Sequence, residues 1–342
     1  MKLSLIGALA AVAVASSGFG QVKINDTVSL TGWATGSYQY TSPSPGASFD
    51  SFNLDAAMLS AIITPPKTPL TATLSALYRP AGEGGVSPSG SEVTLLDAYV
   101  SYAASSTVTV SAGKFLSYLG YESFYFDLDN MISLANQQLL APIPGYHEGV
   151  KLDFQPDKTD VMGVAVIDSL YQKPGYNATE GDGEFKHSAG FEAYYQNTSI
   201  NNLTIWAGIG YETLTKPGVD TGGVAAPQGS TVTVYDLWAA YVLDKNGDQI
   251  AAEEIYKSGG TGNKGSDWLT YFQYNFDPKT YCWFGISGED VTGGARYIKY
   301  SISPTYNLTA NLAVRAQYSY TSYSSFAINS ANYGAVEMIV KF

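Results

Sequence analysis

The chain has 342 residues, a formal net charge of −12 at pH 7 and a single cysteine, Cys282. The acidic balance without a basic patch argues against nucleic-acid binding, and one cysteine excludes a framework of intrachain disulfides. Tyrosine is abundant, with 27 residues against 14 phenylalanines and 5 tryptophans. Because tyrosine favours strands and membrane interfaces, this composition requires an architecture that uses it.

The first 20 residues predict a secretory signal peptide. Lys2 precedes an apolar run over 3–15, and small residues follow that run, which is the order typical of such peptides. Cleavage is expected after Gly20, with Ala15 as the alternative. No apolar run reaches the roughly 18 residues that a membrane helix needs. The exported chain is therefore either soluble or a closed β-barrel.

Period-2 alternation of apolar and polar residues recurs from residue 28 to the end. In 203–212, for example, Leu203, Ile205 and Ile209 share one face, while Thr204 and Glu212 lie on the other. Segments of about ten such residues between turns are typical of transmembrane barrel strands. Sixteen strands are predicted: 28–41, 52–64, 70–79, 93–103, 107–115, 148–155, 160–167, 184–196, 203–212, 231–243, 249–257 (the weakest pattern), 267–276, 280–289, 295–303, 312–321 and 333–342.

The connections between these strands alternate in length, with few exceptions. The long "SPSPGASFDS" is followed by the short "PPKTP", and "TLTKPGVDTGGVAAPQGS" is followed by "DKNGD". Outer-membrane barrels have short periplasmic turns and long extracellular loops, whereas a soluble sandwich has no reason to alternate in this way. The sequence therefore predicts an all-β fold, a single antiparallel up-and-down transmembrane barrel over 21–342.

The stretch 113–150 interrupts this alternation. Its middle, 127–140, has apolar residues at helical intervals, and these are Leu128, Ile132, Ala135 and Leu139. A long loop that contains a short helix is therefore predicted here. A loop of about 30 residues inside a compact domain is usually functional or a sign of misassigned elements.

Motifs for catalysis or metal binding are not found. The chain has two histidines, His147 and His187, and they lack metal-ligand spacing. His147 sits at the start of a predicted strand, directly before residue 148, and is interpreted as a residue of the barrel rim. The segment 244–255 resembles a calcium loop, but Gln249 and Ile255 replace the required Gly and Glu, so a hairpin turn around Asn246-Gly247 explains it better. We expect no enzyme, no metal and no cofactor.

The chain ends on an alternating segment, "YGAVEMIVKF", that stops at Phe342. A C-terminal aromatic residue that closes such a strand resembles the assembly signal of bacterial outer-membrane proteins. An ordinary final strand is the alternative.

Strand parity sorts the charged residues onto one face of the predicted barrel. Their neighbours on the other face are mostly apolar, which suits lipid contact, because a charge facing lipid is costly. Five acids and three bases are expected to face the lumen, namely Asp55, Asp97, Asp153, Glu192, Glu337, Lys151, Lys299 and Arg315. A mildly acidic lumen predicts weak cation preference.

The stretch around 113–150 contains a series of short motifs. They are Gly113-Lys114-Phe115, Gly120-Tyr121-Glu122, Asn130, Ser133, Pro142 or Pro144, and His147-Glu148-Gly149. This series resembles the pattern of the second β-barrel porin family, called OmpL-like. The second strand, "FNLDAAMLSAIITPP" (52–66), also resembles that family, and the close resemblance covers about a third of the chain. One departure is that 127–140 looks more helical than the family pattern. The resemblance implies an outer-membrane porin of Gram-negative bacteria.

In porins of sixteen strands the third long loop characteristically folds into the barrel and narrows the channel. By this analogy 113–150 is expected to form the constriction, with Glu122, Asp127 and Asp129 presenting acid to the pore. The alternative is an extracellular lid helix. The expected function is passive diffusion of small polar solutes or ions, and the alternatives are an adhesive or structural surface protein, an outer-membrane enzyme and a secreted soluble β protein. Expected partners are outer-membrane lipid, small hydrophilic solutes and the assembly machinery, with a homotrimer as one option.

Overall fold

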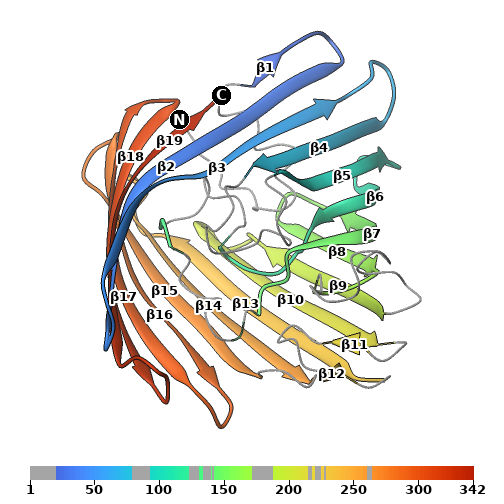
Figure 1. Ribbon diagram of the computed structural model, residues 1–342. Coiled ribbons are helices and arrows are strands. Elements are labelled where there is room, and N and C mark those ends of the chain that lie inside the picture. Colours follow the sequence, from blue (N-terminus) through green and yellow to red (C-terminus); the bar gives the residue numbers. More distant parts are fainter. Residues whose placement is uncertain are drawn as a thin grey trace.

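The computed structural model shows one closed antiparallel β-barrel (Figure 1). It describes residues 21–78, 93–122, 131–133, 140, 142–171, 188–214, 218–219, 225–226, 229–259 and 264–342. Sixteen strands form the wall: β2 (Val28–Ser44), β3 (Phe49–Ile63), β4 (Leu70–Tyr78), β5 (Val93–Ala103), β6 (Val108–Leu116), β7 (Tyr146–Phe154), β8 (Asp160–Ile167), β9 (Ser188–Asn197), β10 (Leu203–Leu214), β13 (Thr231–Val242), β14 (Gln249–Gly259), β15 (Gly265–Asn275), β16 (Thr280–Val291), β17 (Arg296–Thr309), β18 (Leu312–Ser324) and β19 (Ser330–Lys341).

The number of strands and the fold class predicted from the sequence are thus confirmed. Two small additions are β1 (Val22–Lys23), which pairs with β2, and a two-stranded hairpin of β11 (Gly218–Val219) and β12 (Ala225–Ala226). Among the described residues, no helix is long and apolar enough to cross a membrane.

Two sequence predictions lie wholly or largely outside the described residues. The signal peptide covers residues 1–20, none of which is described. Of the predicted helix 127–140, the structure describes only 131–133 and Leu140. Both therefore stay predictions.

The barrel closes where the last strand pairs with the first long one. β19 runs antiparallel to β2, from Ser330 opposite Ser44 to Lys341 opposite Trp33. At the end of this seam, the N–H groups of Gly32 and Phe342 each donate to the other's carbonyl at 2.9 Å. Closure removes the free strand edges that would otherwise expose unpaired backbone groups.

The two faces of the wall alternate along each strand as pleating requires. On β14, Ala251, Glu253 and Ile255 are buried and point inward, whereas Glu254 and Tyr256 are exposed on the outer face. Elsewhere the outer face carries many exposed apolar and aromatic side chains, including Leu237, Phe284, Ile298, Val336 and Met338. An exposed apolar surface of this extent marks contact with an apolar environment.

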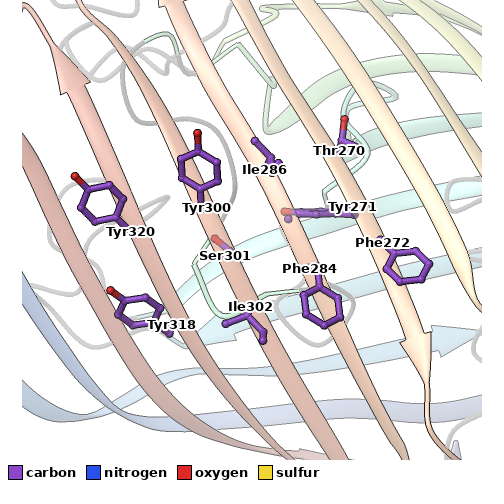
Figure 2. Close-up of a pocket in the computed structure, with 11 residues that line it drawn as sticks. Thr270, Tyr271, Phe272, Phe284, Ile286, Tyr300, Ser301, Ile302, Tyr318 and Tyr320 are labelled. Carbon is purple, nitrogen blue, oxygen red and sulfur yellow. The ribbon is translucent and has the colours of Figure 1, made fainter.

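A shallow groove of about 440 Å³ lies on the outer face of β15 to β18. Figure 2 shows side chains from these four neighbouring strands around it, including Phe272, Phe284, Tyr300 and Tyr320. These four residues belong to the exposed outer set. The groove is therefore part of the outer wall and is separate from the barrel interior.

Short turns join the strands at one end of the barrel, and aspartates stabilise several of them. The Asp157 carboxylate accepts the backbone N–H groups of Thr159 and Asp160, and these bonds lower its pKa. The backbone N–H groups of Lys279 and Thr280 lower the pKa of Asp277 in the same way. Such side-chain caps fix tight turns because they satisfy N–H groups that have no strand partner.

The segment that resembled a calcium loop is also one of these turns. Asp244 accepts the N–H groups of Asn246 and Asp248, and Gly247 adopts a φ of 88° that favours glycine. The turn links β13 to β14 as the hairpin interpretation predicted.

Candidate functional site

The connection between β6 and β7, residues 117–145, is here called the third loop. Its described residues, 117–122, 131–133, 140 and 142–145, lie inside the barrel (Figure 1). Its backbone N–H groups donate to carboxylates on successive strands. Tyr118 N–H bonds to Glu192 on β9 at 2.9 Å, and Gly120 N–H bonds to Asp236 on β13 at 2.8 Å.

The following part of the third loop continues the same pattern. Tyr121 N–H donates to Glu253 on β14, and the N–H of Leu140 donates to Glu289 on β16. The side chain of Glu122 accepts the hydroxyl of Tyr271 on β15. The described parts of the loop thus follow the wall strand by strand.

The third loop also reaches the strands beyond β16. The amide oxygen of Gln317 on β18 accepts the N–H groups of Ile132 at 2.6 Å and Ser133 at 3.0 Å. Lys299 on β17 donates to the Ser133 hydroxyl at 2.8 Å. Because the loop leaves from β6 and contacts β9 through β18, it crosses the inside of the barrel.

Glycines in the inner wall make room for apolar side chains of the loops. A Cβ added at Gly208 on β10 would lie 2.5 Å from Leu119, and one at Gly210 would lie 2.8 Å from Leu170. A Cβ at Gly285 on β16 would lie 2.7 Å from Met131. Because these glycines have no side chain, Leu119, Leu170 and Met131 pack directly against the backbone of the wall.

A second inward segment follows β8, at residues 168–171, and it was not expected from the sequence. Glu212 on β10 accepts the N–H groups of Leu170 and Tyr171. The Tyr171 hydroxyl donates to the carbonyl of Pro142 at 2.8 Å, and Lys257 lies 4.5 Å from the centre of the Tyr171 ring. This segment therefore packs against both the wall and the third loop.

His147 lies between the two inward segments. One ring nitrogen contacts the Ser169 carbonyl at 2.8 Å, and the other contacts Glu192 at 3.0 Å. Glu192 also accepts the Ser117 hydroxyl. His147 is the second residue of β7, close to the predicted strand start, but it is only 1 % exposed and is not a solvated rim residue. The histidine and glutamate thus join both inward segments to the wall.

Aromatic side chains fill the space beneath this part of the third loop. Trp206 stacks on Tyr194 at 4.2 Å and on Trp238 at 5.6 Å between ring centroids. Tyr121 of the loop contacts Trp238 and Tyr271 edge-on or tilted. The barrel interior next to β9, β10, β13 and β15 is therefore a packed core, and Tyr121 of the third loop is part of it.

The predicted lumen residues all lie on the inner side of their strands. The Asp55 carboxylate accepts hydrogen bonds from the Ser37 hydroxyl and the Gln39 side-chain amide, and Asp97 is buried on β5. Asp153 accepts the hydroxyls of two tyrosines.

The predicted lumen bases have partners as well. The Lys151 ammonium lies 5.1–5.5 Å from three aromatic rings, those of Tyr99, Phe115 and Tyr118. Arg315 pairs with Glu337 at 3.3 Å, with both side chains buried. Of the three predicted constriction acids, Glu122 is buried against Tyr271, whereas Asp127 and Asp129 lie outside the described residues.

Several inner-wall charges were not predicted from the sequence, and they are Glu212, Asp236, Glu253, Asp267, Glu289 and Lys257. On several of these strands large apolar residues also point inward, such as Val234 and Trp238 beside Asp236, so the two faces differ little in polarity. The adjacent acids Glu253 and Glu254 were a usable signal, because two neighbouring residues of a strand must point to opposite faces. Among the described residues, no group of three or more His, Cys, Asp or Glu could hold a metal ion.

A closed sixteen-strand barrel with an apolar outer face and an inward third loop has the architecture of outer-membrane porins. The chain matches the family described as "Putative beta-barrel porin-2, OmpL-like" over residues 27–342, and it belongs to that family. The resemblance seen in the sequence is thereby confirmed, and so is the location in the bacterial outer membrane. A comparison with curated proteins finds no sequence match.

Solved structures of outer-membrane channels share the fold at low sequence identity. OmpF of Salmonella typhi, in complex with daunomycin, aligns with a TM-score of 0.69 and 14 % identity over 94 % of this chain and 100 % of its own. The channel DcaP of Acinetobacter baumannii aligns with a TM-score of 0.65 and 9 % identity, over 92 % of this chain and 97 % of its own. An anion-selective porin from Comamonas acidovorans aligns with a TM-score of 0.64 and 12 % identity, over 92 % of this chain and 99 % of its own.

Proposed function

We propose that this protein is a porin that lets small polar solutes and ions diffuse passively across the outer membrane, and that it is a channel and not an enzyme. We further propose that the third loop narrows the channel. The observation that carries the proposal is the path of the loop, which bonds to inner-wall residues from β9 to β18. A segment that crosses the barrel interior must reduce the cross-section available to solutes.

We expect the refolded mature chain to give discrete conductance steps in planar lipid bilayers. A barrel of sixteen strands is wide enough for an aqueous channel even when a loop occupies part of it. The same preparation should migrate differently on gels with and without boiling, which checks that the barrel has formed. A heat-modifiable barrel that never conducts, across salts and voltages, would contradict the porin function.

We propose weak cation preference, because acids outnumber bases on the inner face of the described strands. The acids are Asp55, Asp97, Asp153, Glu192, Glu212, Asp236, Glu253, Asp267, Glu289 and Glu337, and the bases include Lys151, Lys257, Lys299 and Arg315. The preference is weak because Glu192, Asp236, Glu253 and Glu289 already accept backbone N–H groups of the third loop and are not counted on to attract ions. The remaining acids still outnumber the named bases. A reversal potential in a potassium chloride gradient measures it, and a clear anion preference would refute this assignment.

A homotrimer is proposed as the assembled form. One related structure, OmpT of Vibrio cholerae, is described as a trimer form and aligns with a TM-score of 0.57. We also propose that Phe342 serves as the signal for the outer-membrane assembly machinery, since it directly follows the strand that closes the barrel and pairs with Gly32.

A further inference from the structure

Four buried carboxylates of the inner wall share one kind of partner, the backbone N–H of the third loop. Glu192, Asp236, Glu253 and Glu289 lie on β9, β13, β14 and β16, and each is at most 4 % exposed. They accept the N–H groups of Tyr118, Gly120, Tyr121 and Leu140 respectively. The contacts are therefore spread along the loop and over a stretch of six neighbouring wall strands, from β9 to β16.

The chemistry of these contacts suits the fixing of a loop. The backbone N–H groups of Tyr118, Gly120 and Tyr121 point at a barrel wall whose own backbone groups are already paired between strands. Buried N–H groups need an acceptor, and a carboxylate gives a stronger bond than a neutral oxygen. Because the donors are main-chain groups, these hydrogen bonds fix the position of the loop backbone and do not depend on the identity of the loop side chains.

We propose that Glu192, Asp236, Glu253 and Glu289 are positioning residues that fix the third loop across the barrel, and that they are not charges encountered by passing ions. This inference rests on the proposed function, in which the third loop narrows the channel. A positioning residue should control the fraction of time that the third loop is docked against the wall. A selectivity residue should instead control which ion crosses.

The adjacent pair Glu253 and Glu254 offers a matched test on one strand. Glu253 points inward and accepts the Tyr121 N–H, whereas Glu254 is exposed on the outer face. We expect Glu253→Leu to raise the population of undocked loop on the order of tenfold, because the buried Tyr121 N–H loses its acceptor. In single-channel recordings this appears as more open-channel noise and extra conductance levels, with an unchanged reversal potential.

Two further variants sharpen the comparison. Glu253→Gln keeps an acceptor oxygen and should lie between the wild type and Glu253→Leu in channel noise. Glu254→Leu should match the wild type in noise and in reversal potential. If Glu253→Gln shifts the reversal potential and leaves the noise unchanged, the carboxylate faces the ion path and the positioning role is wrong. Equal behaviour of the Glu253 and Glu254 variants would also overturn it.

Hydrogen exchange of the loop amides gives a readout that does not depend on conduction. A peptide that spans 117–122 should exchange about tenfold faster in Glu253→Leu than in the wild type, since the docked state protects these N–H groups. Unchanged exchange would overturn the proposal. Should Glu253→Leu fail to assemble, Glu289→Gln tests the same role at Leu140. A wild-type barrel that never conducts, but whose exchange responds as expected, would refute the porin function and leave the positioning role intact.

Discussion

Removing residues 127–140 is expected to raise the single-channel conductance roughly twofold or more, because a sixteen-strand barrel is wide enough for an aqueous channel without an inward segment. The deletion removes the contacts of Ile132 and Ser133 with Gln317 and that of Leu140 with Glu289. The conductance of the refolded variant in planar bilayers measures the effect.

A deletion in a different connection controls for a general disturbance of the barrel. Residues 325–327 lie in the connection between β18 and β19 and are exposed, so a chain that lacks them should conduct like the wild type. If the 127–140 deletion leaves the conductance unchanged, this segment lies outside the pore, as the lid alternative holds.

The second large effect is expected at the closing seam of the barrel. A Cβ at Gly32 would lie 2.5 Å from the backbone oxygen of Met58 and 2.6 Å from the ring of Phe342. Since a backbone oxygen cannot move aside without disturbing the ladder, Gly32→Ala should lower the free energy of unfolding by about 1–3 kcal/mol. The measurement is the urea midpoint of the refolded barrel, together with the fraction that shows heat-modifiable migration.

Gly334 provides the matched control at the same seam. It lies on β19 opposite Tyr40, and a Cβ added there would meet no atom within 4 Å. Gly334→Ala should therefore leave the urea midpoint unchanged or slightly higher, because alanine restricts the unfolded chain. Equal losses in both variants would show that the crowding at Gly32 does not limit closure.

The barrel was predictable from the sequence because most strands face two different environments. On β19, Val336, Met338 and Val340 point outward and Glu337 points inward, so the amino-acid sequence itself shows the alternation of apolar and polar residues. The closing strand and the lengths of the connections then gave the strand count and the long third loop.

The inward loops were harder to derive because they turn part of the lumen into a protein core. On β13, Val234 and Trp238 point inward against the loops while Tyr235 and Leu237 point outward, and both faces are apolar. The alternation of apolar and polar residues, which marks a strand whose inner face lines a water-filled channel, is therefore weak on β13. Asp236 looks like an isolated acid in this sequence. The short inward segment at 168–171 has no periodicity at all, so only the three-dimensional contacts of Glu212 and His147 identify it.

The contacts between wall carboxylates and loop N–H groups have a consequence for engineering the channel. The positions 118, 120, 121 and 140 contribute only their main chain to these bonds, so the bonds themselves do not depend on which side chains the loop carries. Two limits apply: proline has no N–H to donate, and Gly120 has a φ of 103° and lies so close to Ile143 that glycine is favoured there. The barrel can thus serve as a fixed frame for a library of third loops, in which the chemistry of the opening is varied while its path is retained.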